Sequence, residues 1–228
     1  MIALVDYGAG NLTSVRKALS ALGADFATPV APGELTGARG IIVPATPDEC
    51  RSARGLIVPG VGHFGATARL DAPWRDAISA AAAAGKPLFG ICVGMQWLFE
   101  GSEEAPETPG FGAIAGRIAR LSGDADKRLK VPHVGWNSLE FRGPARLLAG
   151  LQPGAQVYFT HSYAAPVTPE CVASTTHANT FSSVVERDNI FGVQFHPEKS
   201  SDAGLQILRN FLDAAEGTPS RRSGTLAC

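Results

Sequence analysis

The first half of the chain alternates short apolar runs with stretches of helical periodicity. The apolar runs, each about as long as a buried strand, are Ile2–Asp6, Leu56–Val58 and Pro87–Ile91. The stretches with helical signals are Leu12–Leu22, Trp74–Ala84 and Gly94–Glu100, the first with Asn11 as a candidate cap. This alternation predicts a mostly parallel sheet with helices on both faces.

The second half of the chain has a different pattern, with strand candidates that follow one another closely. They are Gly135–Phe141, Gln156–Thr160, Val172–Thr176, Ser182–Glu186 and Ile190–Gln194. Such spacing predicts hairpins or a mixed extension of the sheet. Leu205–Ala215 has apolar residues at helical spacing and predicts a final amphipathic helix.

These patterns predict one α/β domain over residues 1–215. Its expected architecture has three layers, a mostly parallel or mixed central sheet flanked by helices, with an added antiparallel strand region in the second half. Residues 216–228 are rich in Ser, Thr, Gly and Arg, and we expect them to form a flexible tail.

A short internal repeat interrupts the first half. Pro32–Pro44 resembles Pro47–Pro59 at an offset of 15 residues, so residues 32–47 are interpreted as an insertion that arose by local duplication. Only the second copy continues into Gly60-Val61-Gly62, and it should supply the strand that leads to the site described below. The first copy, Gly40–Pro44, is expected to form an edge strand or a surface loop, because proline cannot donate to a sheet ladder.

Composition narrows the class of protein. The 228 residues are 45% hydrophobic and 18% charged, which suits a globular core, and the net charge of −1 argues against nucleic acid as a partner. No apolar run reaches the roughly 18 residues that a membrane helix needs, and the N-terminus lacks the basic start of a signal peptide. The four cysteines are scattered, so we expect neither disulfides nor a metal site, and a reducing cytoplasmic location.

The strongest chemical signal is Gly90-Ile91-Cys92-Val93-Gly94, which lies between a buried strand and a helix. This is the cysteine form of a nucleophile elbow, in which a sharp turn exposes the reactive atom. The helix N-terminus favours a thiolate, and the N–H of Val93 can face an oxyanion. A lone cysteine is more often a small buried hydrophobe, but the flanking glycines favour the catalytic interpretation.

A base for this cysteine is found at the end of the last strand candidate. His196 is followed two residues later by Glu198, and residues two apart on an extended segment share a face. Glu198 could therefore orient the imidazole, as the third member of a triad does. An isolated His-x-Glu would more simply be a structural histidine, so this assignment depends on the cysteine elbow.

Two glycine-rich turns are candidate binding loops. Pro59-Gly60-Val61-Gly62 follows a strand and can present backbone N–H groups to a ligand. Gly8-Ala9-Gly10 falls short of a dinucleotide fingerprint, because Thr13 occupies the last glycine position, and no organic cofactor is expected.

Together these motifs resemble the class I (triad) glutamine amidotransferases, over roughly residues 1–214 apart from the repeat. More narrowly, the chain is similar to the glutaminase subunits of imidazole glycerol phosphate synthases, a family of histidine biosynthesis. The segments that carry this similarity are Asp6–Leu12, Val131–Asn137, Tyr158–Tyr163 and Gly192–Ser200.

The resemblance implies a role for each matching residue. Cys92 would be the nucleophile, His196 the base and then the acid, and Glu198 its orienting group. The remaining assignments are Gly60, Val61, Gly62 and Val93 at the oxyanion; Gln96, His161, Ser162 and Tyr163 at the glutamine; and Asn11, His133, Trp136, Asn137 and Lys199 on the side facing the partner.

The implied reaction is hydrolysis of L-glutamine to glutamate, with no metal or organic cofactor. The ammonia would pass through a channel to a (β/α)8-barrel cyclase in a 1:1 heterodimer. The cyclase would form imidazole glycerol phosphate and aminoimidazole carboxamide ribotide. Two alternatives stay open: a sister subunit that feeds anthranilate or pyridoxal phosphate synthesis, and a non-catalytic binding subunit of the same fold. The first would not need the His133–Asn137 segment, and the presence of all three triad residues weakens the second.

Overall fold

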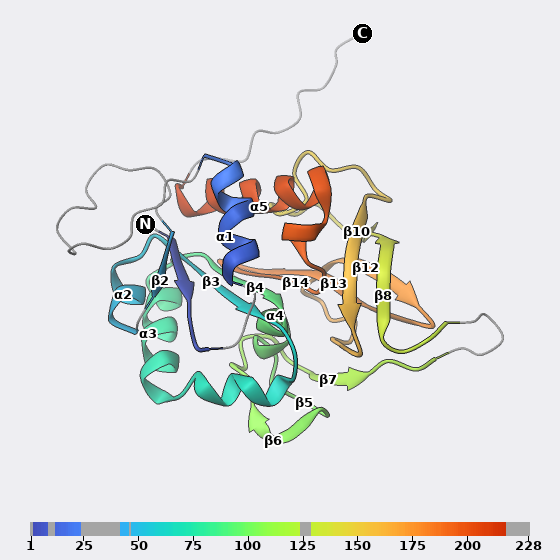
Figure 1. The fold of residues 1–228 in the computed structure, drawn as a ribbon, viewed down its shortest axis with the longest axis horizontal. Coiled ribbons are helices and arrows are strands. Elements are labelled where there is room, and N and C mark those ends of the chain that lie inside the picture. The colour runs from blue at the N-terminus through green and yellow to red at the C-terminus, as the bar shows by residue number, and fades with distance from the viewer. Residues whose placement is uncertain (1, 9–11, 24–41, 46, 124–128, 218–228) are drawn as a thin grey trace, which may run out of the picture.

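A mixed eight-stranded sheet forms the centre of the molecule in a computed structural model (Figure 1). The structure describes residues 2–8, 12–23, 42–45, 47–123 and 129–217. The strand order in this sheet is β2-β1-β3-β4-β14-β13-β12-β9. In chain order the strands are β1 (Ile2–Val5), β2 (Ile42–Ala45), β3 (Gly55–Gly60), β4 (Leu88–Cys92), β9 (Glu140–Phe141), β12 (Cys171–His177), β13 (Asn179–Arg187) and β14 (Ile190–Val193).

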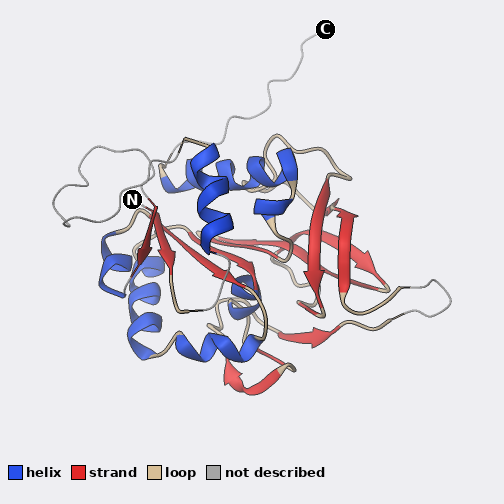
Figure 2. Ribbon diagram, viewed as in Figure 1, coloured by secondary structure: helices blue, strands red, loops and turns tan. Residues whose placement is uncertain are grey.

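The sheet changes direction part-way across. From β2 to β14 every neighbouring pair is parallel, and from β14 to β9 every pair is antiparallel. Figure 2 shows this antiparallel half leading away from the helices. The predicted α/β fold, with its antiparallel region in the second half, is therefore confirmed.

Helices cover both faces of the parallel half. On one face lie α1 (Leu12–Ala21) and α5 (Ser201–Ala215), and on the other lie α2 (Pro47–Ser52), α3 (Ala72–Ala83), α4 (Val93–Trp97) and the 3-10 helix η1 (Phe64–Arg69). Successive residues of a strand point to opposite faces, so Leu4 packs with the α1 and α5 layer while Val5 packs with the α3 layer.

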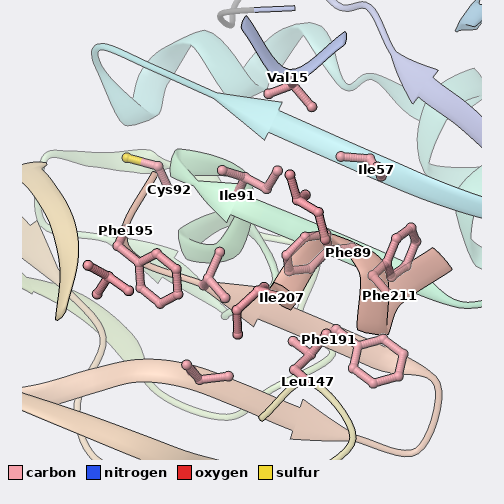
Figure 3. Close-up of a cluster of buried hydrophobic side chains, with 14 of the residues drawn as sticks. Val15, Ile57, Phe89, Ile91, Cys92, Leu147, Phe191, Phe195, Ile207 and Phe211 are labelled. Carbon is pink, nitrogen blue, oxygen red and sulfur yellow. The ribbon is translucent and has the colours of Figure 1, made fainter. Parts of the chain in front are cut away.

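The core beneath α5 is rich in phenylalanine (Figure 3). The rings of Phe89 on β4 and Phe211 on α5 stack with centroids 5.0 Å apart, and Phe191 on β14 meets Phe211 edge to face. Truncating one of these buried rings to alanine would cost roughly 3–5 kcal/mol. This packing holds β4 and β14 against α5, and the candidate catalytic residues lie at the carboxyl ends of these two strands.

Two small sheets complete the molecule. β8 (His133–Ser138) and β10 (Gln156–His161) form an antiparallel pair. The other sheet holds strands that the sequence analysis missed, namely β5 (Gly101–Ser102), β6 (Ala105–Pro109), β7 (Arg117–Arg120) and β11 (Tyr163–Ala164). Two to five residues with prolines and charges have too little alternation to predict a strand.

Several boundaries differ from those expected. β3 continues through Pro59 and Gly60 instead of stopping before them. Proline is tolerated there because β1 pairs with β3 only as far as Ile57, so at its end β3 pairs with β4 on one side only. The short helix α4 covers Val93–Trp97 rather than Gly94–Glu100.

The first copy of the repeat contributes an edge strand, one of the two placements expected for it. β2 pairs in parallel with β1 at the end of the sheet. The stretch 24–41 and the segment 218–228 lie outside the described residues, as does Asn11. Among the residues that are described, no helix is long and apolar enough to cross a membrane.

Candidate active site

Cys92 lies at the sharp turn between β4 and α4. Its backbone angles are φ 54° and ψ −112°, a left-handed conformation that is rare for a residue with a side chain. Glycine is needed on the helix side of this turn, since a Cβ at Gly94 would come within 1.8 Å of the Val58 carbonyl oxygen. The turn is therefore pressed against β3, and the thiol is held at the carboxyl end of the sheet.

His196 follows the neighbouring strand, β14, and is anchored through its backbone. Its N–H donates to the carbonyl of Tyr158 on β10, and its own carbonyl accepts a hydrogen bond from the Ser200 hydroxyl. The imidazole Nδ1 lies 2.9 Å from Oε1 of Glu198, which belongs to the 3-10 helix η2 (Pro197–Lys199). Both side chains are almost fully buried.

The electrostatic environment favours a charged imidazole. Burial by itself lowers the pKa of His196, but hydrogen bonds to Cys92 and Glu198 and the negative charges of those groups outweigh it and raise the pKa to about 10. The predicted triad is thus brought together from the ends of two adjacent parallel strands. A cysteine, a histidine and a glutamate in this order are suited to nucleophilic attack on an amide.

Two buried glutamines lie behind the thiol, and the sequence analysis identified only one of them. Gln194 Nε2 approaches Cys92 Sγ at 3.8 Å, and its Oε1 accepts from Gln96 Nε2 at 3.1 Å. Gln96 Nε2 also donates to the Tyr163 carbonyl at 2.9 Å. Gln194 was missed because a polar residue next to a strand end gives no signal until its neighbours are known.

The predicted oxyanion segment meets the elbow. Gly60, the last residue of β3, is in register with Cys92, and a Cβ at Gly60 would lie 2.7 Å from the N of Gly94. Gly62 has φ 85°, which favours glycine, and Val61 between them is partly exposed. Gly60, Val61, Gly62 and Val93 therefore lie next to the thiol.

A cavity of about 380 Å³ opens above the thiol. Its lining includes the candidate catalytic, oxyanion and glutamine-contacting residues Val61, Gly62, Cys92, Val93, Gln96, His161, Ser162, Tyr163 and His196. Glu104, between β5 and β6, also lines the cavity and was not predicted. Its Oε2 accepts a hydrogen bond of 2.7 Å from the N–H of Phe64.

The residues expected to face a partner divide into surface and interior. Trp136 is 52% exposed and meets the Tyr158 ring edge to face. Lys199 lies over the ring of the same tyrosine. Asn137 is partly buried. His133 is only 3% exposed, so its side chain cannot contact a partner directly. That part of the expectation is corrected, because the alternation of a strand turns this position inward.

Comparison with known proteins agrees with this geometry. Residues 3–215 match the family model described as "Glutamine amidotransferase class-I". The chain belongs to the class I glutamine amidotransferase family. Within this family it is 44% identical to the imidazole glycerol phosphate synthase subunit HisH of Halobacterium salinarum, with 93% of this chain and 92% of the relative covered. The HisH subunit of Thermococcus kodakarensis is 42% identical, with 92% and 98% covered.

Solved structures support the same fold at lower identity. A crystal structure of a glutamine amidotransferase superposes with a TM-score of 0.68 at 18% identity, covering 94% of this chain and 98% of the other. A chain of PurLQS from Thermotoga maritima gives a TM-score of 0.61 at 17% identity, covering 93% and 97%. At these identities the likeness concerns the fold of the amidotransferase domain alone.

Proposed function

We propose that this chain is the glutaminase subunit of an imidazole glycerol phosphate synthase and hydrolyses L-glutamine to supply ammonia for histidine biosynthesis. The observation that carries the proposal is the position of Cys92. Its thiol lies at a left-handed strand-to-helix turn, in a cavity, beside the buried His196–Glu198 pair. The identity to HisH subunits over nearly the whole chain supports the choice of synthase.

The chemistry follows from these groups. The Cys92 thiolate attacks the side-chain carboxamide carbon of glutamine, and backbone N–H groups near Val61 and Val93 stabilise the oxyanion. The tetrahedral intermediate collapses when His196 donates its proton to the departing nitrogen, which leaves as ammonia. A water molecule, deprotonated by His196, then attacks the thioester. Glutamate departs and the thiolate is regenerated.

The cavity wall suits an amino-acid substrate. The amide nitrogen of Gln96 donates its two hydrogens to Tyr163 and Gln194. Its amide oxygen is therefore the atom that can accept a hydrogen bond from a donor group of the substrate glutamine. Glu104 adds a carboxylate to the wall, which matches the α-ammonium group of glutamine. His161, Ser162 and Tyr163 complete the glutamine site in this proposal.

The proposed partner is a (β/α)8-barrel cyclase in a 1:1 heterodimer, which would receive ammonia through a protected channel. Trp136 and Lys199 lie together at the surface beside the cavity, on either side of the Tyr158 ring. Free ammonia is wasteful, so we expect low activity when the chain is alone. Turning one peptide near Gly60–Gly62 would complete the oxyanion site when the loaded cyclase binds, which glycine makes inexpensive.

The test combines the two proteins with glutamine or with ammonium salts. Cys92→Ala should abolish glutamine-dependent product formation, while ammonium should still support cyclisation by the complex. Cys171→Ala is the matched control, because Cys171 is another buried free cysteine but lies on β12, outside the cavity lining. Residual glutaminase activity above about 1% in Cys92→Ala would remove this residue from the role.

A second arm separates the alternatives. Glutamine turnover is measured for the lone chain, and with each candidate synthase in the presence and absence of its acceptor substrate. Activation by the imidazole glycerol phosphate cyclase alone supports the proposal, whereas activation by an anthranilate or pyridoxal phosphate synthase would reassign the chain. Full activity of the lone chain would contradict the proposed regulation.

A further inference from the structure

Three histidines from three different strands meet beside the candidate active site; His133 and His161 are buried, and His177 is partly exposed. His133 begins β8, His161 ends β10 and His177 ends β12, and the first two are directly opposite in the β8–β10 ladder. His133 stacks on Phe159 at 4.7 Å and on His177 at 4.1 Å between ring centroids. Buried imidazoles of this kind must satisfy both of their nitrogens.

The hydrogen bonds of two of these rings have a defined direction. His161 Nδ1 lies 2.9 Å from the Tyr163 carbonyl, which can only accept, so Nδ1 carries the proton. In a neutral ring His161 Nε2 is then an acceptor, and His133 Nδ1, 3.1 Å away, must donate to it. His133 Nε2 is left as an acceptor.

Asn137 satisfies that last nitrogen. Its Nδ2 lies 3.3 Å from His133 Nε2 and also donates to the Thr176 carbonyl, while its Oδ1 accepts from the N–H of Ser138. Every polar atom of the Asn137 amide is therefore used. The protons of Asn137, His133 and His161 are fixed in one arrangement that points toward Tyr163.

Both rings stay neutral, as this arrangement requires. Burial, together with His161 and His177, lowers the pKa of His133 to about 3. Burial likewise lowers the pKa of His161 to about 4; the Tyr163 carbonyl opposes the shift, and His177 and His196 add to it.

The hydrogen bonds from Asn137 through His133 and His161 end at the Tyr163 carbonyl, in the candidate glutamine site. The Tyr163 carbonyl that accepts from His161 also accepts from Gln96, and Gln96 is bonded through Gln194 to the vicinity of the Cys92 thiol. At the near end, β8 turns Val134 and Trp136 to solvent, 56% and 52% exposed, and His133 and Asn137 inward. One strand thus joins the exposed apolar surface to this set of bonds.

We propose that His133 is a positioning residue of the glutaminase site: with Asn137 it holds the His161 ring, and through it the Tyr163 carbonyl that anchors Gln96. The proposal rests on the proposed function. His133 touches neither the thiol nor the cavity, since it is absent from the cavity lining. Its effect should therefore appear in the binding of glutamine more than in the chemical step.

The test is a set of matched variants assayed in the complex with the cyclase. His133→Phe keeps the ring stacking and removes both nitrogens, and it should raise KM for glutamine on the order of fivefold while kcat changes less. His133→Gln supplies one donor and one acceptor, as the neutral imidazole does, and should restore KM to within about twofold. His177→Phe is the control, because His177 stacks on the same ring but bonds to the Lys130 carbonyl.

A measurement on the native protein is independent of activity. Nitrogen-15 NMR of the imidazoles should show His161 and His133 neutral, each protonated at Nδ1 only. An unchanged KM in a folded His133→Phe variant, or His133 protonated at Nε2, would overturn the inference. If His133→Phe does not fold, the NMR result decides. Absence of glutaminase activity in the native complex would instead reject the proposed function and leave the NMR test standing.

Discussion

At the scale of single residues, Cys92 has a backbone conformation that its neighbours must enforce. A non-glycine residue at φ 54° costs of the order of 1–3 kcal/mol and persists only where its surroundings enforce it. The enforcement comes from glycine contacts on either side, since a Cβ at Gly90 would come within 2.6 Å of the Gly94 carbonyl oxygen. The strain aims the thiol at the cavity instead of into the core.

The proposed division of labour between His196 and Glu198 can be tested by substitution. His196→Ala should lower kcat by about a thousandfold or more, because no other group can carry the proton. Glu198→Gln should lower it less, roughly ten- to a hundredfold, because the amide can still accept from Nδ1 but loses the charge that raises the His196 pKa. Steady-state glutamine hydrolysis measures both, and equal losses would give Glu198 a different role.

Tyr7 offers a stability prediction at the same scale. Its hydroxyl is buried and has no hydrogen-bond partner among the described residues. Burial, with the charge of Cys92, raises the pKa of the phenol, so that it stays neutral. Tyr7→Phe removes a desolvated and unpaired group, so the free energy of unfolding should rise by about 1 kcal/mol in urea titrations. Tyr158→Phe, at the surface-facing cluster with Trp136, is the control and should change it little. A destabilised Tyr7→Phe would mean that the hydroxyl is bonded.

At the scale of elements, β3 and β4 work as a unit. Their register brings Gly60 opposite Cys92, and this pairing alone sets the distance between the oxyanion segment and the nucleophile. β14 adds His196 from the other side of β4. The candidate site therefore depends on three neighbouring parallel strands, and β2 at the sheet edge is not one of them.

The repeat gives a prediction about the edge. Deleting the 15 residues Gly33–Pro47 removes β2, which pairs with β1 and with no other strand of the described residues, and leaves the β1–β3–β4–β14 pairing intact. We expect a folded protein with a lower Tm that the cyclase still activates, since closing a shorter surface connection costs little. Circular dichroism and the coupled assay check this. Loss of folding would make β2 integral to the sheet and would put the assignment of β3 as the oxyanion strand in doubt.

At the scale of the whole molecule, the buried histidines couple stability to pH in opposite directions. The pKa of His196 is raised from 6.5 to about 10, so its contribution is complete below pH 6.5 and is lost as the pH rises toward 10. The pKa values of His133 and His161 are lowered, to about 3 and 4, so their contribution is present above pH 6.5 and is lost as the pH falls.

The free energy of unfolding should therefore decline on both sides of about pH 6.5. Urea titrations at a series of pH values measure it, and two variants separate the causes. His133→Phe should weaken the fall of the unfolding free energy below pH 6.5. The variant lacks a group that binds a proton in the unfolded chain but not in the native state. Glu198→Gln should flatten the alkaline side. If His133→Phe leaves the pH dependence of the unfolding free energy below pH 6.5 unchanged, His133 is not one of the groups that cause it.

Much of this protein is determined by local sequence. Apolar runs and helical patterns were sufficient for β1, β3, β4, α1 and α3, because each of these strands is a continuous apolar run and each of these helices carries its own end signals. The short helices α2 and η1 were not predicted. The elbow at Cys92 could be recognised for the same reason, since the glycines that permit the turn are its immediate neighbours. The short strands β5, β6, β7 and β11 could not, because so few residues carry no periodic signal.

Only the tertiary structure decided which distant residues share the site. Glu104 reaches the cavity from a segment with no motif of its own, and Gln194 reaches the thiol and Gln96 across about 100 positions of sequence. Likewise His133 looked like a surface residue until the β8–β10 register placed it against His161. The physical reason is that a hydrogen bond depends on distance and direction in space, which the strand order and register set, whereas local patterns determine only which elements form.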